Sequence, residues 1–129
     1  MMKKLLFLLF ALVALTACQE SIKDRAERDA RETTAKRLPI RMNDQGTLIL
    51  ERISFDKTTL VWKEDFLLDV AATNVDWQMV REALLKELKN QPSYKPYLEH
   101  GFVFSYIYCD MSNPKDTVAN ITFTDKDYR

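Results

Sequence analysis

The chain has 129 residues, with 19 basic and 19 acidic side chains, which is the size and composition of one small domain. This balanced charge gives no electrostatic attraction to a phosphate backbone, so nucleic acid is not expected as a partner. The glycines are Gly46 and Gly101 alone, which excludes the glycine-rich loops that cradle nucleotide phosphates.

The first eighteen residues have the pattern of a secretory signal peptide. Two lysines precede an uncharged apolar run from Leu5 to Leu15, which is too short to span a bilayer. The following Leu15-Thr16-Ala17-Cys18 resembles the lipobox of bacterial lipoproteins, in which the cysteine is acylated and the peptide before it is removed. The resemblance implies that residues 1–17 are a lipoprotein signal peptide and that Cys18 carries the lipid. The alternative is a buried hydrophobic helix with an incidental cysteine.

The residue after the acylated cysteine is a sorting signal in lipoproteins of Gram-negative bacteria. Aspartate there usually keeps the protein in the inner membrane, so Gln19 implies, by the same resemblance, the periplasmic face of the outer membrane. Loss of Lys3 and Lys4 with the signal peptide leaves 17 basic against 19 acidic residues, which provides no polybasic membrane patch. The N-terminal lipid is therefore the expected membrane attachment.

Residues 18–37 are predicted to form a charged helical tether. Opposite charges recur here at a spacing of four residues, where they meet on a helix surface. The apolar stripe is thin and consists of Ile22, Ala26 and Ala30. We interpret the segment as a solvated helix that carries the globular domain, residues 38–129, away from the membrane. A partner-binding helix is the alternative. Leu38-Pro39 ends the helix, since the residue before proline disfavours the α region.

About four strands are predicted in the globular domain. Thr47–Phe55 and Thr58–Leu68 alternate around a turn at Asp56-Lys57, which is typical of a β-hairpin. Phe102–Cys109 is apolar on both faces, as expected of an interior strand. Thr117–Thr124 alternates as a last strand.

Two helices are predicted between the second and third strands. The first begins near Val75 after a Thr73-Asn74 cap, and it has an apolar stripe formed by Trp77, Val80, Leu84 and Leu88. A short helical turn from Tyr94 to His100 is closed by Gly101. The predicted fold class is α+β: a small antiparallel sheet with the amphipathic helix packed on one face, preceded by the N-terminal charged helix.

No catalytic constellation, cofactor motif or metal site is evident, and we expect the protein not to be an enzyme. His100 is the sole histidine, and its place at a helix C-terminus explains it. His100 and Cys109 could form a base and a nucleophile. However, Cys109 shares a strand face with Val103 and Ile107, so we expect a buried, reduced thiol instead.

Aromatic residues are numerous for a domain of this size. Most are expected in the core, but any that the helices leave uncovered would form a binding surface. The candidate partner-binding residues are Tyr94, Phe102, Tyr106 and Tyr108.

The order of features resembles the α/β class of type II secretion pilotins. The shared order is a lipobox, a charged helix, Leu38-Pro39-Ile40, the Thr47–Leu50 strand, an amphipathic helix, then Pro92–Leu98 and Gly101 before an aromatic strand. Pilotins are outer-membrane lipoproteins that bind the C-terminal segment of a secretin subunit and carry it to the outer membrane. The resemblance implies a lipid-anchored periplasmic binding or targeting protein whose partner is an envelope protein such as a secretin. The alternative is an inhibitor or immunity lipoprotein that acts on a periplasmic hydrolase.

Overall fold

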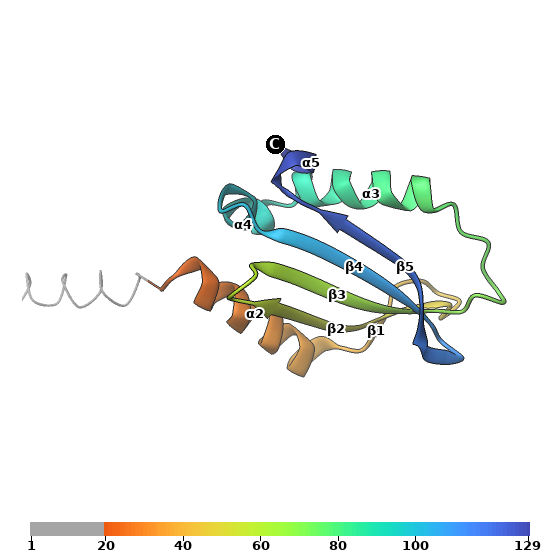
Figure 1. Ribbon diagram of the computed structural model, residues 1–129. Coiled ribbons are helices and arrows are strands. Elements are labelled where there is room, and N and C mark those ends of the chain that lie inside the picture. The colour runs from red at the N-terminus through yellow and green to blue at the C-terminus, as the bar shows by residue number, and fades with distance from the viewer. Residues whose placement is uncertain (1–19) are drawn as a thin grey trace, which may run out of the picture.

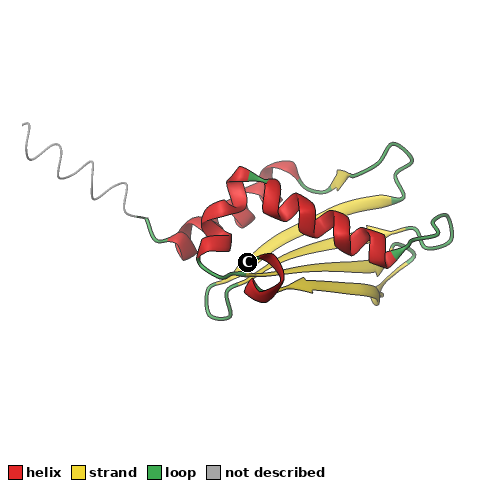
Figure 2. Cartoon of the chain, turned by 90° about the horizontal axis from the view of Figure 1, so that it is seen from above, coloured by secondary structure: helices red, strands yellow, loops and turns green. Residues whose placement is uncertain are grey.

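The computed structural model describes residues 20–129, so the predicted signal peptide and Cys18 lie outside the described residues. A twisted sheet carries helices on one face (Figures 1 and 2), which confirms the α+β prediction. None of the helices in this part of the chain is long and apolar enough to cross a membrane. The elements follow in the order α2 (Ile22–Arg37), β1 (Ile40–Arg41), β2 (Leu48–Asp56), β3 (Val61–Leu68), α3 (Trp77–Asn90), the 3-10 turn η1 (Pro92–Tyr94), α4 (Lys95–Glu99), β4 (Val103–Asp110), β5 (Asn113–Phe123) and α5 (Asp125–Tyr128).

The described sheet has five strands in the order β1-β2-β3-β4-β5, rather than the four predicted. The additional strand, β1, is only two residues long and is too short to show an alternating pattern. Neighbouring strands are antiparallel except β3 and β4, which run parallel. The prediction of a wholly antiparallel sheet is wrong at this pair. The chain between these strands forms α3, η1 and α4, and a helical crossover of this kind joins parallel strands.

The predicted hairpin of β2 and β3 is confirmed, with Phe55 paired to Trp62 beside the turn. A register irregularity between Leu50 and Arg52 acts as a β-bulge in β2. The extra residue lets both Leu50 and Ile53 point to the buried face although they are three positions apart.

The helix-facing side of the sheet carries most of the core. Its buried side chains come from all four long strands and are Leu50, Ile53, Phe55, Trp62, Glu64, Phe66, Leu68, Phe104, Tyr106, Tyr108, Ile121 and Phe123. On the opposite face, side chains such as Lys63, Ile107 and Cys109 are only half-buried. No described helix packs there. The sheet therefore has one covered face and one open face.

The charged helix α2 packs directly on β2. Ala26 and Ala30 are almost completely buried in the core cluster. The Thr34 hydroxyl donates to the Ile53 carbonyl at 2.8 Å and accepts from the Ile53 amide at 3.0 Å. This hydroxyl satisfies main-chain groups on the outer edge of β2 that β1 is too short to pair. The apolar stripe noted in the sequence is thus thin because small side chains let α2 approach the strand closely.

Helix α3 begins two residues later than predicted. The Asp76 carboxylate, not the Thr73-Asn74 pair, accepts from the amides of Gln78 and Met79 at 3.1 and 3.2 Å and caps the helix. The short helix before β4 is confirmed as η1 and α4, closed by Gly101 in the left-handed region at φ 70°.

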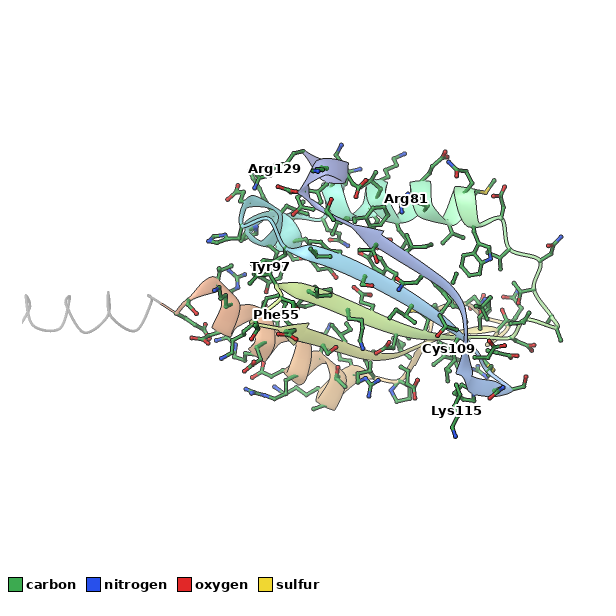
Figure 3. All side chains as sticks on the ribbon, viewed as in Figure 1. Phe55, Arg81, Tyr97, Cys109, Lys115 and Arg129 are labelled. Atoms are coloured by element: carbon green, nitrogen blue, oxygen red, sulfur yellow. The ribbon has the colours of Figure 1, made fainter. Side chains whose placement is uncertain are left out.

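The C-terminal helix α5 was not predicted. It has four residues, and its buried Tyr128 donates a hydrogen bond to the Phe102 carbonyl at 2.7 Å. Arg81 of α3 lies over the Phe123 ring at 4.7 Å and reaches Asp127 at 3.4 Å. These contacts hold α5 and α3 against the end of β5 (Figure 3).

Candidate partner-binding pocket

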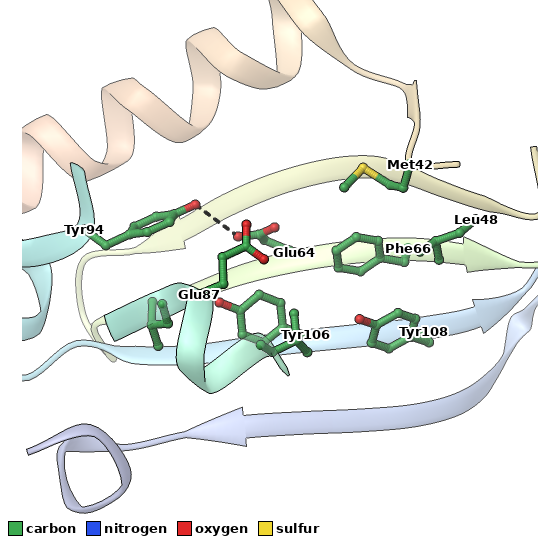
Figure 4. A pocket seen from close by; sticks show the side chains of 10 residues that line it. Met42, Leu48, Glu64, Phe66, Glu87, Tyr94, Tyr106 and Tyr108 are labelled. Atoms are coloured by element: carbon green, nitrogen blue, oxygen red, sulfur yellow. Dashed lines mark hydrogen bonds between the residues drawn. The ribbon is translucent and has the colours of Figure 1, made fainter. Parts of the chain in front are cut away.

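A pocket of about 150 Å³ lies between α3 and the covered face of the sheet (Figure 4). The β1–β2 connection, β2, β3, β4, α3 and η1 all contribute side chains to it. The lining residues are Met42, Leu48, Glu64, Phe66, Leu84, Glu87, Leu88, Tyr94, Tyr106 and Tyr108. The pocket combines an apolar wall with five oxygen-bearing side chains.

The apolar wall follows from the parallel pairing of β3 and β4. This register places Phe66 beside Tyr108 and Glu64 beside Tyr106. The Phe66 and Tyr108 rings stack with centroids 4.7 Å apart, and Trp77 of α3 meets Tyr108 edge-on at 5.0 Å. These aromatic contacts fix the ring orientations and make a rigid floor.

Glu64 is the unusual residue of the site, because it is a carboxylate on the covered face with only 8% of its surface exposed. Its Oε2 atom accepts from the Trp62 indole at 3.0 Å and from the Tyr94 hydroxyl at 3.5 Å. Both bonds end on the same oxygen. No described residue donates a hydrogen bond to Oε1, which leaves an acceptor available to a ligand.

A second carboxylate, Glu87 of α3, lines the same pocket from above the strands (Figure 4). Within residues 20–129, neither Glu64 nor Glu87 forms a salt bridge. Burial raises the pKa of Glu64 above its ordinary value, and the charge of Glu87 adds to the rise, whereas the Trp62 hydrogen bond opposes it. Burial, followed by the charges of Glu64 and Glu87, raises the pKa of Tyr108 to about 12. The two carboxylates of the pocket therefore face it without a cationic partner among residues 20–129.

Three of the four candidate residues from the sequence meet in this pocket. Tyr94 is partly exposed at its edge, while Tyr106 and Tyr108 are each 5% exposed and form its floor. Phe102 does not line it. That ring stacks on Tyr97 at 5.3 Å and belongs to the core.

The two carboxylates of the site, Glu64 and Glu87, were not predicted from the sequence. Glu64 occupies an inward position in the strict alternation of β3, between Trp62 and Phe66, and this pattern could have identified it. Glu87 and Met42 reach the pocket only through the packing of α3 and the β1–β2 connection, and no local pattern marks them.

His100 and Cys109, the two residues considered as a base and a nucleophile, do not form a catalytic pair. The prediction that Cys109 is buried is wrong: it lies half-exposed on the open face, with its sulfur 3.9 Å from the Thr117 hydroxyl. Burial fails because all the described helices pack on the other face. His100 ends α4, where its Nδ1 lies 2.9 Å from the Pro96 carbonyl. It precedes the first residue of β4, whereas Cys109 lies at the other end of that strand. Residues 20–129 contain no group of three or more potential metal ligands.

The family described as "Domain of unknown function (DUF8479)" matches residues 21–119. The pattern described as "Prokaryotic membrane lipoprotein lipid attachment site" matches residues 2–19, a stretch that includes Cys18. The chain is thus a lipoprotein with a lipoprotein signal peptide. No curated protein matches it in sequence.

Three solved structures share the fold. A protein of Pseudomonas aeruginosa has a TM-score of 0.69 at 16% identity, covering 85% of this chain and 99% of that one. The type 2 secretion pilotin EpsS of Vibrio vulnificus has a TM-score of 0.66 at 17% identity, covering 83% and 91%. The type II secretion pilotin AspS of Vibrio cholerae has a TM-score of 0.61 at 16% identity, covering 88% and 98%. At these identities the comparison establishes the fold.

Proposed function

Since this chain belongs to the DUF8479 family and is a lipoprotein, we propose that it is a pilotin-like targeting protein, lipid-anchored at the periplasmic face of the outer membrane. Its partner is the C-terminal segment of a secretin subunit or of a comparable envelope protein. It carries out no enzymatic reaction. Cys18 is the acylated residue.

The observation that carries this proposal is the pocket beside α3. It is open to a partner, has an aromatic floor, and lies on a fold that the Vibrio pilotins share. An apolar pocket with a few convergent polar groups is the usual form of a binding site. Tyr94 and Met42 stand at its margin, and Met42 is 50% exposed.

A helix laid along this face suits the site better than a strand added to the sheet edge. A helix bound in this way places individual side chains in pockets of the surface that receives it, and this pocket provides one such place. One edge of the described sheet is β5, where Pro114 lacks an amide hydrogen, and the other is formed by the two-residue β1 and the part of β2 against which α2 packs. Edge pairing also depends on main-chain contacts, so it would leave the pocket unused.

The test is site-specific photo-crosslinking in cells of the native host. A benzophenone amino acid is placed at Met42, on the margin of the pocket, in the full-length lipoprotein. The matched control carries it at Lys115, which projects from the β4–β5 hairpin away from the helices (Figure 3). Crosslinked products from envelope membranes are identified by mass spectrometry.

The proposal expects a secretin subunit crosslinked at Met42 and absent at Lys115. A periplasmic hydrolase crosslinked at Met42 would instead establish the inhibitor or immunity alternative. Equal crosslinking from the two positions would show that the pocket is not the binding site.

A further inference from the structure

We propose that the pocket binds one basic side chain, lysine or arginine, of the partner segment. The charged head group lies between Glu64 and Glu87, and the alkyl stem lies against Phe66 and Tyr108. This inference rests on the proposed function, because it specifies the chemistry of the segment that the pocket receives.

The size of the pocket sets the size of its occupant. Its volume of about 150 Å³ is far too small for a helix or strand. An engineered apolar cavity of about 150 Å³ holds one benzene molecule, so this pocket holds one side chain. The backbone of the partner must stay outside, where Met42 and Tyr94 form the margin.

The lining selects a cation over an apolar side chain. An apolar occupant would bury the Glu64 carboxylate more deeply and leave its Oε1 atom without a donor, which is costly for a charged group. A guanidinium or ammonium group donates to that oxygen and also supplies the missing charge. Glu87 provides further acceptor oxygens on the opposite side.

Residues 20–129 supply no cation to this site. Arg81 of α3 is engaged with Asp127, and Lys63 of β3 lies on the open face beside Asp65. The two pocket carboxylates thus stay unpaired among the described residues. The aromatic wall adds to the selectivity, since an alkyl-linked cation packs favourably on aromatic faces.

The test uses the mature acylated protein in detergent micelles, with its two tryptophans labelled with 15N. The indole of Trp62 donates to Glu64, so its resonance reports on the pocket directly. Three probes are titrated: n-butylguanidinium, n-butylammonium and the uncharged n-butylurea. The first two distinguish an arginine from a lysine site, and the third has nearly the same shape as the first without its charge.

We expect saturable shifts of the Trp62 indole with at least one cation and at least tenfold weaker binding of n-butylurea. The preference for the cation over n-butylurea should disappear in Glu64→Gln and fall at least threefold in Glu87→Gln. It should persist in Glu82→Gln, which removes an exposed charge from the same helix. Because Glu87 is exposed, its variant remains informative even if Glu64→Gln does not fold.

Equal affinity for the guanidinium and the urea, or no saturable binding of either cation, would overturn the inference. Retention of the preference in the folded Glu64→Gln protein would do the same. None of these results bears on whether a secretin subunit crosslinks to the benzophenone amino acid at Met42. This inference can therefore fail while the proposed function stands.

Discussion

Replacing Glu64 by glutamine should stabilise the free protein at neutral pH. The carboxylate is buried on the covered face and has no cationic partner among the described residues. A glutamine carbonyl can still accept from the Trp62 indole and the Tyr94 hydroxyl, which now meet at Oε2. The substitution therefore removes the cost of the buried charge and keeps the hydrogen bonds.

The size of this stabilisation depends on pH, because it follows from the ionisation of the Glu64 carboxyl. Burial is the main cause that raises the folded-state pKa of Glu64 above its ordinary value of 4.5. The folded chain thus binds this proton more tightly than the unfolded chain. The associated stability is complete at low pH and is lost as the pH rises through the raised pKa. For each unit by which folding raises the pKa of Glu64, the wild type loses about 1.4 kcal/mol of unfolding free energy once the pH exceeds the folded-state pKa.

Urea unfolding from pH 4 to pH 8, followed by circular dichroism, measures the difference between Glu64→Gln and wild type. The groups facing Glu64 are Glu87, Tyr94, Tyr106 and Tyr108. The tyrosines stay protonated throughout this range, since burial raises the pKa of Tyr108 to about 12 and those of the other two further. The exposed substitution Glu82→Gln, with the same change of charge, is the control.

We expect the variant to gain stability over wild type between acid and neutral pH, because only the wild type loses free energy of unfolding as the Glu64 carboxyl ionises. The control should show little change. Parallel curves for wild type and Glu64→Gln would mean that Glu64 ionises normally in the folded protein. That result would refute the reasoning about a buried, uncompensated charge.

Three further predictions concern other parts of the chain. Cys18→Ser should abolish acylation and membrane retention, as read by intact mass and membrane fractionation; normal retention would contradict the lipid site. Cys109 should react with a maleimide in the native protein because it lies on the open face, and labelling that occurs only in denaturant would show that this face is covered. Thr34→Val should lower the unfolding free energy by about 1–3 kcal/mol, since both hydrogen bonds to Ile53 are lost, whereas Thr33→Val should cost less in the same urea titration.

The elements predicted well from sequence are those with a long local pattern. The β2–β3 hairpin and the amphipathic stripe of α3 each extend over several repeats, so neighbouring residues support the same interpretation. Strand β1 and helix α5 have two and four residues and offer no such repeat. They form because the sheet edge and the core around Tyr128 hold them in place.

The pairing of strands and the covering of faces are set by contacts distant in sequence. The pattern of β4 showed two apolar faces but not which one the helices would cover, and for this reason Cys109 was wrongly placed in the core. The pocket could not be predicted for the same reason, because it is formed by contacts between residues that are distant in sequence. Tyr106 and Tyr108 were identified by residue type, yet their meeting with Glu87 depends on the parallel register of β3 and β4 and on the position of α3.

The packing of α2 bears on how far the domain can stand from the membrane. With the lipid on Cys18, as proposed, only Gln19 and Glu20 separate it from the helix cap at Ser21, and these three chain steps span at most about 11 Å. Helix α2 then runs along β2, held by buried Ala26 and Ala30 (Figure 1). Extending the anchor by detaching this helix would expose those contacts and leave the main-chain groups of Ile53 without Thr34. A partner bound in the pocket would therefore be held close to the bilayer surface, which suits a protein that delivers its partner to the membrane better than one that reaches far into the periplasm.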